Sequence, residues 1–392
     1  MISVSIASQI LNESTGPGLP ALLPLNAVSG LVLAEDILAP RNIPAFRQAA
    51  MDGYAFNYES WKSNGQLEVS GEIPAGAGNV TDLKRQQAMR IFTGAPVPDG
   101  ADTVVMQEKT TVEAALLQIT DDVLKQGGNV RPIGSEAMAG SLALRKGTKL
   151  TPAAIGFLAT MGIAAVKVYP KPRVHIIITG NELQSPGQPL AAGQVYEANS
   201  ASLMAALHQL HITDVNVQHV EDNLEALQLA ISKALANADI VLTTGGVSVG
   251  DYDFVAEALS SCGVTTLFHR VKQKPAKPMY AGKLGNTLIF GLPGNPSAVL
   301  TCFYVYVQPV LQRLMGQPAS EVKTLPITHD FVKPSGLTHF LKGICSDTQV
   351  TLLTGQESYK LNTFAIANCL VKLAPEGQVY RVGDEVEIIM IG

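Results

Sequence analysis

The sequence predicts an α/β fold with additional β-rich parts, and three stretches of the chain lead to this prediction. Over residues 173–315, apolar strands alternate with amphipathic helices, as in a mostly parallel sheet covered on both faces, a three-layer α/β sandwich. Residues 26–150 are rich in glycine, proline and short alternating runs, which indicate β structure with long loops. After Pro318 the chain returns to strands and turns, which predicts a small β-barrel-like domain of about 70 residues.

The composition is that of an ordered protein with several domains. The chain has 392 residues, 46% of them hydrophobic and 16% charged, and its length predicts roughly two to four domains. The net charge of −5 disfavours a nucleic-acid partner, which would need a basic face. No apolar run approaches the ~18 residues of a spanning helix, so no membrane partner is expected.

The N-terminus and the cysteines indicate a cytoplasmic protein. The first residues, MISVSIASQILNE, lack the basic region of a signal peptide and predict a short amphipathic helix. The cysteines show no paired spacing, which favours buried thiols in a reducing compartment over zinc ligands or disulfides. They are Cys262, Cys302, Cys345 and Cys369. His208 and His211 share a helical face without a third ligand, so we interpret them as a surface pair.

Hydrophobic periodicity and capping residues give the order of elements in the central region. Strands are expected at 173–178, 214–220, 239–244, 264–269 and 286–291, and helices at 199–210 (opened by Asn199), 222–238, 253–260 and from 295 onward. Asp222 with Glu225 resembles a capping box, and Asn295-Pro296 places an N-cap residue before proline at the first helical position. Residues 151–162 predict a compact helix with a threonine cap and a terminal glycine.

Unusual loops follow three strands of the predicted sheet. One loop carries Asn181 and Glu182, and a glycine-rich loop, GGVSVGDYD, carries Ser248, Asp251 and Asp253. The third is Gly-Leu-Pro-Gly before a helix. Ligands of open α/β sheets bind at the carboxyl ends of the strands, and glycines let the backbone approach them closely. Together these loops predict a ligand that bears phosphate.

Two other interpretations of the glycine-rich loop are weaker. GVSVG matches the nucleophile elbow of a serine hydrolase, but an elbow would continue straight into its helix, whereas aspartates follow here. The loop also lacks the Gly-Lys-Ser/Thr ending of a P-loop, so ATP hydrolysis of that kind is not indicated.

A lysine-rich segment lies between residues 270 and 283, which hold five basic residues and no acid. Lysines on an edge hairpin commonly serve only to keep the edge solvated. In KPAKP, however, prolines restrict the backbone that carries Lys274 and Lys277. Two fixed amines suit an oxyanion with several negative oxygens.

The stretch RQAAMDGYA places Asp52 in an apolar approach, directly before Gly53. Asp-Gly is a common turn dipeptide, so a plain β-turn is one interpretation. The other is a carboxylate held on a loop to meet a ligand.

Six motifs, in this order, resemble those of the molybdopterin molybdenumtransferase family, the bacterial MoeA type that is similar to the gephyrin E domain. They are AMDGYA, FTGAPVPDGADTVVMQE, TGNEL, TTGGVSVGDYDF, KPAKP and GLPGNPSAV. The resemblance spans essentially the whole chain and implies four domains. These are an α/β pterin- and nucleotide-binding domain (1–22 and 172–316), a linking domain (23–40 and 141–171), a β-rich insertion carrying AMDGYA (41–140), and a C-terminal β domain (317–392).

The resemblance implies that adenylylated molybdopterin and molybdate are converted to molybdenum cofactor and AMP with the help of Mg²⁺. The positions that match the family's catalytic residues are Asp52, Thr93, Glu136, Glu182, Asp222 and Asp253. Among them Asp52, Glu182 and Asp253 are the implied Mg²⁺ ligands, since carboxylate oxygens suit this cation. The positions implied to bind pterin, nucleotide or molybdate are Gly245, Gly246, Ser248, Lys274, Lys277, Gly294, Asn295, Pro296, Lys342 and Ser358.

The resemblance also implies a homodimer with shared active sites, in which Asp52 meets the α/β domain of the other subunit. Molybdopterin adenylyltransferase and apo-molybdoenzymes are implied as further partners.

Several positions depart from the family's pattern. Residues 47–49 are Arg-Gln-Ala in place of Asp-Asn-Ser, Ala276 replaces a glycine, and Glu136 replaces an aspartate. Lys342 replaces an arginine, and a lysine lacks the planar guanidinium group that binds an oxyanion through two hydrogen bonds. Two alternatives therefore stay open: a divergent paralogue with altered activity that binds pterin or tungstate, and a binding scaffold without catalysis.

Overall fold

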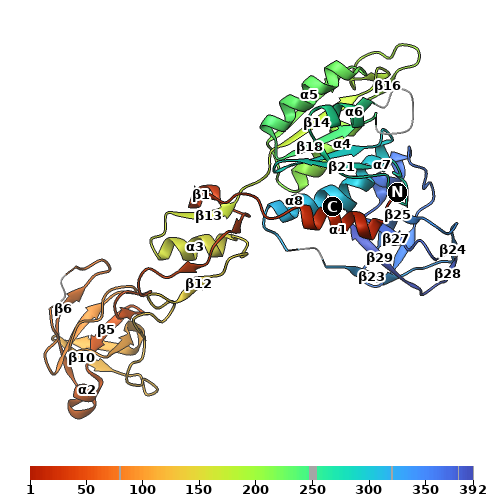
Figure 1. Ribbon diagram of the computed structural model, residues 1–392. Helices are drawn as coiled ribbons and strands as arrows, with labels where there is room; N and C mark the ends of the chain where they lie inside the picture. Colours follow the sequence, from red (N-terminus) through yellow and green to blue (C-terminus); the bar gives the residue numbers. More distant parts are fainter. Residues whose placement is uncertain (79–80, 247–253, 319–320, 378, 392) are drawn as a thin grey trace. The chain divides into compact units, whose positions relative to one another are not determined.

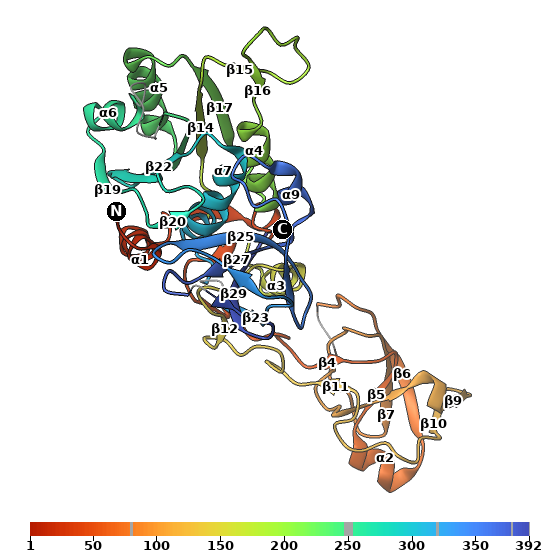
Figure 2. The ribbon, with the colours of Figure 1, turned by 90° about the vertical axis from the view of Figure 1, so that its right-hand side faces the viewer.

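The computed structural model describes residues 1–78, 81–246, 254–318, 321–377 and 379–391. The chain separates into two compact units, one formed by Met1–Ala21 with Val168–Gly392 and the other by Leu22–Lys167. Figures 1 and 2 show the ribbon from two perpendicular directions. The four-domain division expected from the sequence is finer than this separation and stays a prediction.

A six-stranded sheet forms the centre of the first unit, in the order β17-β14-β18-β22-β21-β19. Its strands are β14 (Val174–Thr179), β17 (Val215–Val220), β18 (Ile240–Thr244), β19 (Thr265–His269), β21 (Tyr280–Leu284) and β22 (Thr287–Leu292). The first four strands of this order pair in parallel, and β21 runs antiparallel to both of its neighbours. The sheet is therefore mostly parallel, as the sequence predicts.

Helices cover both faces of this sheet and give three layers (Figure 1). One face carries α5 (Leu224–Asn237) and α6 (Phe254–Ser261), and the other carries α1 (Val4–Ser14), α4 (Asn199–Gln209), α7 (Pro296–Cys302) and α8 (Gln308–Leu314). Consecutive residues of one strand enter opposite cores: Ile176 packs with α1 and α4, and Ile177 packs with α5 and α6. The strands are apolar throughout because both of their faces are buried.

The helix starts of this unit confirm some predicted caps and correct another. The N-cap of α5 is Asn223, whose side chain accepts a hydrogen bond from the Ala226 backbone N–H at 2.8 Å. The capping box expected at Asp222 is therefore wrong, because the Asp222 carboxylate accepts a hydrogen bond from the Thr179 hydroxyl instead. Asn295 does occupy the N-cap position of α7. A π-helical turn, Phe303–Val307, connects α7 to α8.

The C-terminal part of the first unit is a β sheet in the order β20-β25-β27-β29-β23, with β26 paired to β25. Its strands are β20 (Gln273–Lys274), β23 (Lys323–Pro326), β25 (Thr338–Cys345), β26 (Val350–Leu352), β27 (Cys369–Leu373) and β29 (Glu385–Met390). The smaller elements of this unit are β15 (Leu183–Gln184), β16 (Val195–Tyr196), β24 (Phe331–Val332), β28 (Val379–Tyr380) and α9 (Leu361–Ile366). Strand β20 belongs to the lysine-rich segment and pairs in parallel with β25, so this segment supplies an edge strand of the C-terminal sheet.

The second unit contains a six-stranded sheet in the order β8-β5-β7-β6-β10-β9. Its strands are β5 (Gly53–Phe56), β6 (Leu67–Ile73), β7 (Gln87–Ile91), β8 (Thr103–Met106), β9 (Thr110–Glu113) and β10 (Leu116–Ile119). Separate apolar clusters lie on its two faces, with Ala55 in one and Phe56 in the other. A short helix that the sequence analysis missed, α2 (Tyr58–Asn64), begins after Asn57, whose side chain accepts from the Ser60 N–H at 3.0 Å.

The remaining elements are short strands and the predicted compact helix. They are β1 (Ala21–Pro24), β2 (Val32–Leu33), β3 (Ile37–Leu38), β4 (Gln48–Ala49), β11 (Val130–Arg131), β12 (Leu142–Leu144), β13 (Ala165–Tyr169) and α3 (Pro152–Thr160). Thr151 caps α3, as predicted, by accepting from the Ala154 N–H at 3.2 Å. Within the described residues, every helix is too short or too polar to cross a membrane.

Candidate active site

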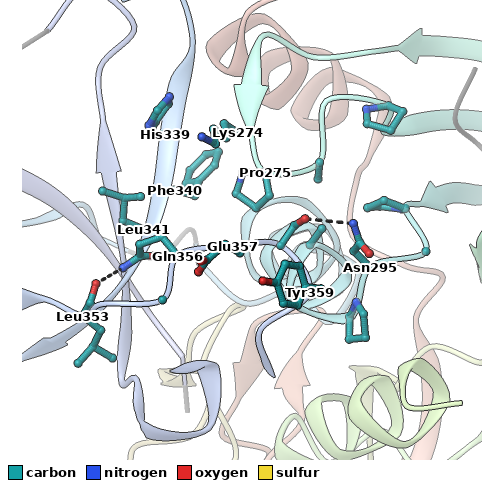
Figure 3. Close-up of a pocket in the computed structure, with 18 of the residues that line it drawn as sticks. Lys274, Pro275, Asn295, His339, Phe340, Leu341, Leu353, Gln356, Glu357 and Tyr359 are labelled. Carbon is teal, nitrogen blue, oxygen red and sulfur yellow. Dashed lines mark hydrogen bonds between the residues drawn. The ribbon is translucent and has the colours of Figure 1, made fainter. Parts of the chain in front are cut away.

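The first unit contains a cavity of 1490 Å³ between the carboxyl ends of the parallel strands and the C-terminal sheet (Figure 3). The expected site residues that line it are Glu182, Gly246, Lys274, Gly294, Asn295, Pro296 and Ser358. Asp222, Gly245, Lys277 and Lys342 belong to the same unit but not to this lining. Ser248 and Asp253 lie outside the described residues. Asp52, Thr93 and Glu136 belong to the second unit.

Two consecutive glycines allow the chain to turn where β18 ends. Gly245 and Gly246 have φ of +86° and +61°, which side chains other than glycine rarely adopt. A Cβ on Gly245 would lie 2.7 Å from the Thr179 backbone oxygen, and one on Gly246 would lie 2.8 Å from Cγ2 of Val255. This turn therefore depends on glycine twice over, for its backbone conformation and for its close packing.

The end of β14 is fixed to the end of β17 by polar contacts. The Thr179 hydroxyl donates to the Asp222 carboxylate, and the Asp222 N–H donates to Oδ1 of Asn181 at 3.4 Å. Glu182 follows directly and lines the cavity. Asp222 thus holds the loop that carries Glu182, which is a positioning contact.

The Gly294–Pro296 turn is held from two directions. Nδ2 of Asn199 donates to the Gly294 carbonyl at 2.9 Å, so Asn199 opens α4 without capping it. Nδ2 of Asn295 donates to Oγ of Ser358 at 3.0 Å. The second bond links the turn to the C-terminal part of the unit and brings two expected ligand-binding residues into contact.

Lys342 is almost completely buried, with 3% of its surface exposed. Its ammonium donates to Oγ of Ser297 at 3.3 Å and to the backbone carbonyls of Glu357 and Lys360, both at 3.2 Å. Burial lowers the pKa of Lys342. Because an ammonium has three N–H groups, an oxyanion could bind Lys342 only by replacing one of these acceptors.

The KPAKP segment presents its two lysines differently. Lys274 is exposed and lines the cavity, whereas Lys277 is exposed outside the lining. Ala276 between them has φ of +67°, the left-handed region that favours glycine. Glycine, which the resemblance implies at this position, would adopt this backbone conformation more readily than alanine.

In the second unit, Asp52 lies directly before β5 and interacts closely with Thr93. The Thr93 N–H and hydroxyl donate to Oδ1 of Asp52 at 2.7 and 2.6 Å. These two bonds hold the pKa of Asp52 below its ordinary value, so the carboxylate is ionised at neutral pH. Glu136 is exposed, and its N–H donates to the Ile43 carbonyl at 2.9 Å.

Comparison with known proteins supports one family. The chain matches the MoeA N-terminal region (domain I and II) over residues 2–162, a probable molybdopterin binding domain over 175–313, and the MoeA C-terminal region (domain IV) over 324–391. A molybdopterin molybdenumtransferase of Haemophilus influenzae is 34% identical over 97% of this chain and 96% of its own. This chain belongs to the molybdopterin molybdenumtransferase family.

Further relatives agree with this membership. The molybdopterin molybdenumtransferase of Nostoc sp. is 42% identical over 75% of this chain and 69% of its own. The crystal structure of a molybdopterin biosynthesis MoeA protein from Pyrococcus horikoshii matches with a TM-score of 0.85 and 27% identity, covering 100% of this chain and 99% of that one. The resemblance inferred from the motifs is confirmed.

Two cavity residues of this molybdopterin molybdenumtransferase family member were missed by the sequence analysis. His339 has 5% of its surface exposed, and burial together with Lys333 and Lys274 lowers its pKa to about 4. Lys333 is 2% exposed and donates to the carbonyls of Pro334, Leu337 and Pro375. In the sequence they are only an isolated histidine and an isolated lysine in a β-rich tail. Such residues are equally compatible with a cavity wall and with an ordinary surface.

The described residues contain no group of three or more His, Cys, Asp or Glu side chains placed to hold a metal ion. Asp253, one of the three expected Mg²⁺ ligands, lies outside them. All four thiols are free: Cys302 and Cys369 are buried, and Cys262 and Cys345 are half-buried.

Proposed function

We propose that this chain inserts molybdenum from molybdate into adenylylated molybdopterin and releases AMP. The observation that carries the proposal is the cavity, where the loops after three parallel strands meet Lys274 and Ser358. Membership of the family supports it, since relatives matched over nearly the whole chain are molybdopterin molybdenumtransferases.

The lining offers suitable contacts for each part of the reaction. The turns at Gly246 and Gly294 let backbone groups approach the phosphates of the adenylylated pterin. Lys274 provides positive charge for the molybdate oxyanion. Cleavage of the phosphoanhydride and delivery of molybdenum to the dithiolene can then occur in one cavity.

Mg²⁺ is part of the proposal, with Asp52, Glu182 and Asp253 as the residues that would hold it. Bound there, Mg²⁺ would neutralise charge on the phosphoanhydride oxygens. The donor chemistry fits, because Asp52 is an ionised carboxylate and Glu182 lines the cavity. Asp52 and Glu182 belong to different units of the chain and do not form a Mg²⁺ site by themselves. A complete Mg²⁺ site therefore requires Asp253 or a second chain.

We further propose a homodimer in which Asp52 of one subunit completes the cavity of the other. Mixing the variants Asp52→Ala and Glu182→Ala tests this, because a heterodimer then keeps one intact site. We expect each variant alone to be inactive and the mixture to regain activity. If verified subunit exchange restores nothing, each site is built from one chain.

Complementation of a strain that lacks its molybdenumtransferase tests the activity itself, with a molybdoenzyme as readout. We expect rescue at ordinary molybdate concentration. Soluble protein without rescue, even at high molybdate, would instead support the divergent binding paralogue. The burial of Lys342 favours this divergent paralogue, because a buried lysine cannot bind the oxyanion with two parallel hydrogen bonds as an arginine could.

A further inference from the structure

The C-terminal sheet brings three sulfur atoms together on one of its faces. Cys369 on β27 pairs with Gly343 of β25 on one side and with Met390 of β29 on the other. Cys345 lies two residues after Gly343, so its side chain leaves the sheet on the same face. The Cys345 thiol donates to Sδ of Met390 at 3.7 Å. The sulfurs therefore come from three neighbouring strands, which Figure 2 shows side by side.

Gly343 leaves the space that this arrangement needs. A Cβ at position 343 would lie 3.2 Å from Sγ of Cys369 and 3.1 Å from Cγ2 of Val371. Both separations are shorter than ordinary van der Waals contact, so any side chain here would press on the Cys369 thiol. Without one, the Cys345 thiol reaches the thiol of Cys369.

The sulfurs lie at the border between an apolar core and solvent. Cys369 is fully buried in a core that also holds Val371 and Ile388, and the half-buried Cys345 packs against this core. Burial, with the neighbouring Cys345 thiol, raises the pKa of Cys369 to about 12. Met390 is 45% exposed. A small ion could therefore reach the sulfurs from the side of Met390.

Asn368 fixes the backbone around the sulfurs. Its side chain accepts from the Cys345 N–H at 2.8 Å and donates to the Cys345 carbonyl at 2.9 Å. Its own N–H donates to the Gly343 carbonyl, and its carbonyl accepts from the Ile391 N–H, both at 3.1 Å. One residue thus ties β25 to the end of β29, so the strands that carry the sulfurs are held in place before any ligand binds.

The spacing and the kind of ligand atoms restrict what the three sulfurs could bind. Diagonal neighbours on antiparallel strands have Cα atoms about 7–8 Å apart, which is too far for a disulfide without backbone movement. Zinc takes four ligands from Cys, His, Asp and Glu. Among the described residues, the two thiols have no third ligand of these types. Thiolates together with a thioether are the ligands that select Cu(I).

We propose that Cys345, Cys369 and Met390 form a binding site for one soft monovalent metal ion, Cu(I). This site is separate from the proposed function and from the cavity. On binding, each thiol would release its proton, so that two thiolate–copper bonds and one thioether–copper bond form without oxidation or reduction. Two thiolates and one Cu(I) leave a net charge of −1. Lys323 on β23, close enough to act on Cys369, supplies positive charge that offsets it.

The test is anaerobic titration of the full-length protein with Cu(I), in competition with the chromophoric chelator bicinchoninate. We expect one Cu(I) per chain. Cys345→Ser and Cys369→Ser should each weaken the affinity by more than about 100-fold, since even partners outside the ligand set are worth 10–100-fold. Cys262→Ser is the matched control and should bind like the parent, because this half-buried thiol contacts Oγ of Ser232 and the Gln228 carbonyl instead of sulfur.

Met390→Leu tests the third ligand with little risk to folding, because Met390 lies at the surface. X-ray absorption spectroscopy of the copper-loaded parent should show three sulfur ligands, and the Met390→Leu protein should show two. Its affinity should fall less than in the cysteine variants, because the thioether is the uncharged ligand. Thermal melting verifies that each variant is folded, and if Cys369→Ser is not, Cys345→Ser and Met390→Leu decide.

Absence of Cu(I) binding to the parent protein would overturn the proposal. Parent-like affinity in the folded Cys345→Ser variant would overturn it as well. An equal loss of affinity in Cys262→Ser would place the copper elsewhere. Two sulfur ligands in the parent, unchanged in Met390→Leu, would exclude the three-sulfur site.

Discussion

The two walls of the cavity are built in different ways. The wall at the strand ends consists of backbone turns, with Gly246 at φ +61° and the Gly294–Pro296 turn. The wall from the C-terminal sheet consists of long side chains, including His339 and Lys333, held by hydrogen bonds and burial. The shape of the backbone wall depends on glycines whose backbone conformation other residues rarely adopt. The shape of the side-chain wall depends on which of its polar groups form hydrogen bonds. The two walls should therefore respond differently to substitution.

The largest effect is expected from Gly245→Ala, in the turn that leads into the backbone wall at Gly246. The alanine would have to adopt φ of +86° and place its Cβ 2.7 Å from the Thr179 carbonyl oxygen. Strain and overpacking together should lower the free energy of unfolding by about 3 kcal/mol. Gly187→Ala is the control, because its φ is +88° but a Cβ there meets nothing within 4 Å. Equal urea-unfolding midpoints for the two variants would contradict the close packing inferred at Gly245.

The next largest effect is expected from Lys342→Met, behind the side-chain wall, because Lys342 holds the segment that carries the lining residue Ser358. Methionine fills the volume but leaves the Ser297 hydroxyl and two carbonyls without their donor, which should cost about 2 kcal/mol of unfolding free energy. Lys333→Met removes an equivalent buried ammonium that does not contact the segment 353–360. Hydrogen exchange measured by mass spectrometry should therefore accelerate in 353–360 only in the Lys342 variant. Equal acceleration in both would mean that Lys342 does not specifically hold this segment.

The backbone wall was largely predictable from the sequence. Glycine and proline restrict φ and packing locally, so GG after an apolar strand and Asn295-Pro296 before a helix indicated their turns directly. The order of strands and helices in 173–315 followed from periodicity for the same reason. The cap at Asn223 was missed because two neighbouring residues can both cap, and the choice depended on the distant hydroxyl of Thr179.

The side-chain wall was not predictable in the same way. The resemblance implied that Lys342 faces an anion. Its actual acceptors come from Ser297, Glu357 and Lys360, and only the folded chain brings these together. The pairing of Lys274 with His339 likewise joins strands that are more than sixty residues apart in sequence. Burial and partner choice are tertiary properties, and a single sequence does not contain them locally.

A smaller effect is expected on the pH dependence of the free energy of unfolding. It arises from His339 in the side-chain wall. The pKa of His339 is about 4 in the folded chain, below the ordinary value of about 6.5 expected when unfolded. Because the folded value is the lower one, the stability linked to His339 is fully present above pH 6.5 and is lost as the pH falls through 4. Urea midpoints measured from pH 7.5 to 4.5 should fall less steeply for His339→Gln than for the parent. Parallel profiles would mean that His339 has the same pKa in both states.

The smallest effect is expected at Ala276, which combines an unusual backbone conformation with a buried side chain. Glycine at φ +67° would remove backbone strain of about 1 kcal/mol. It would also give up about 0.8 kcal/mol for a buried methyl group and add flexibility to the unfolded chain, since Ala276 is 8% exposed and packs in the main core. These terms nearly cancel, so Ala276→Gly should change the free energy of unfolding by less than about 0.5 kcal/mol. Urea unfolding checks the stability, and molybdate titration checks that Lys274 keeps its place. A large gain in either would show that this alanine, and not the buried Lys342, is the costly departure from the family's pattern.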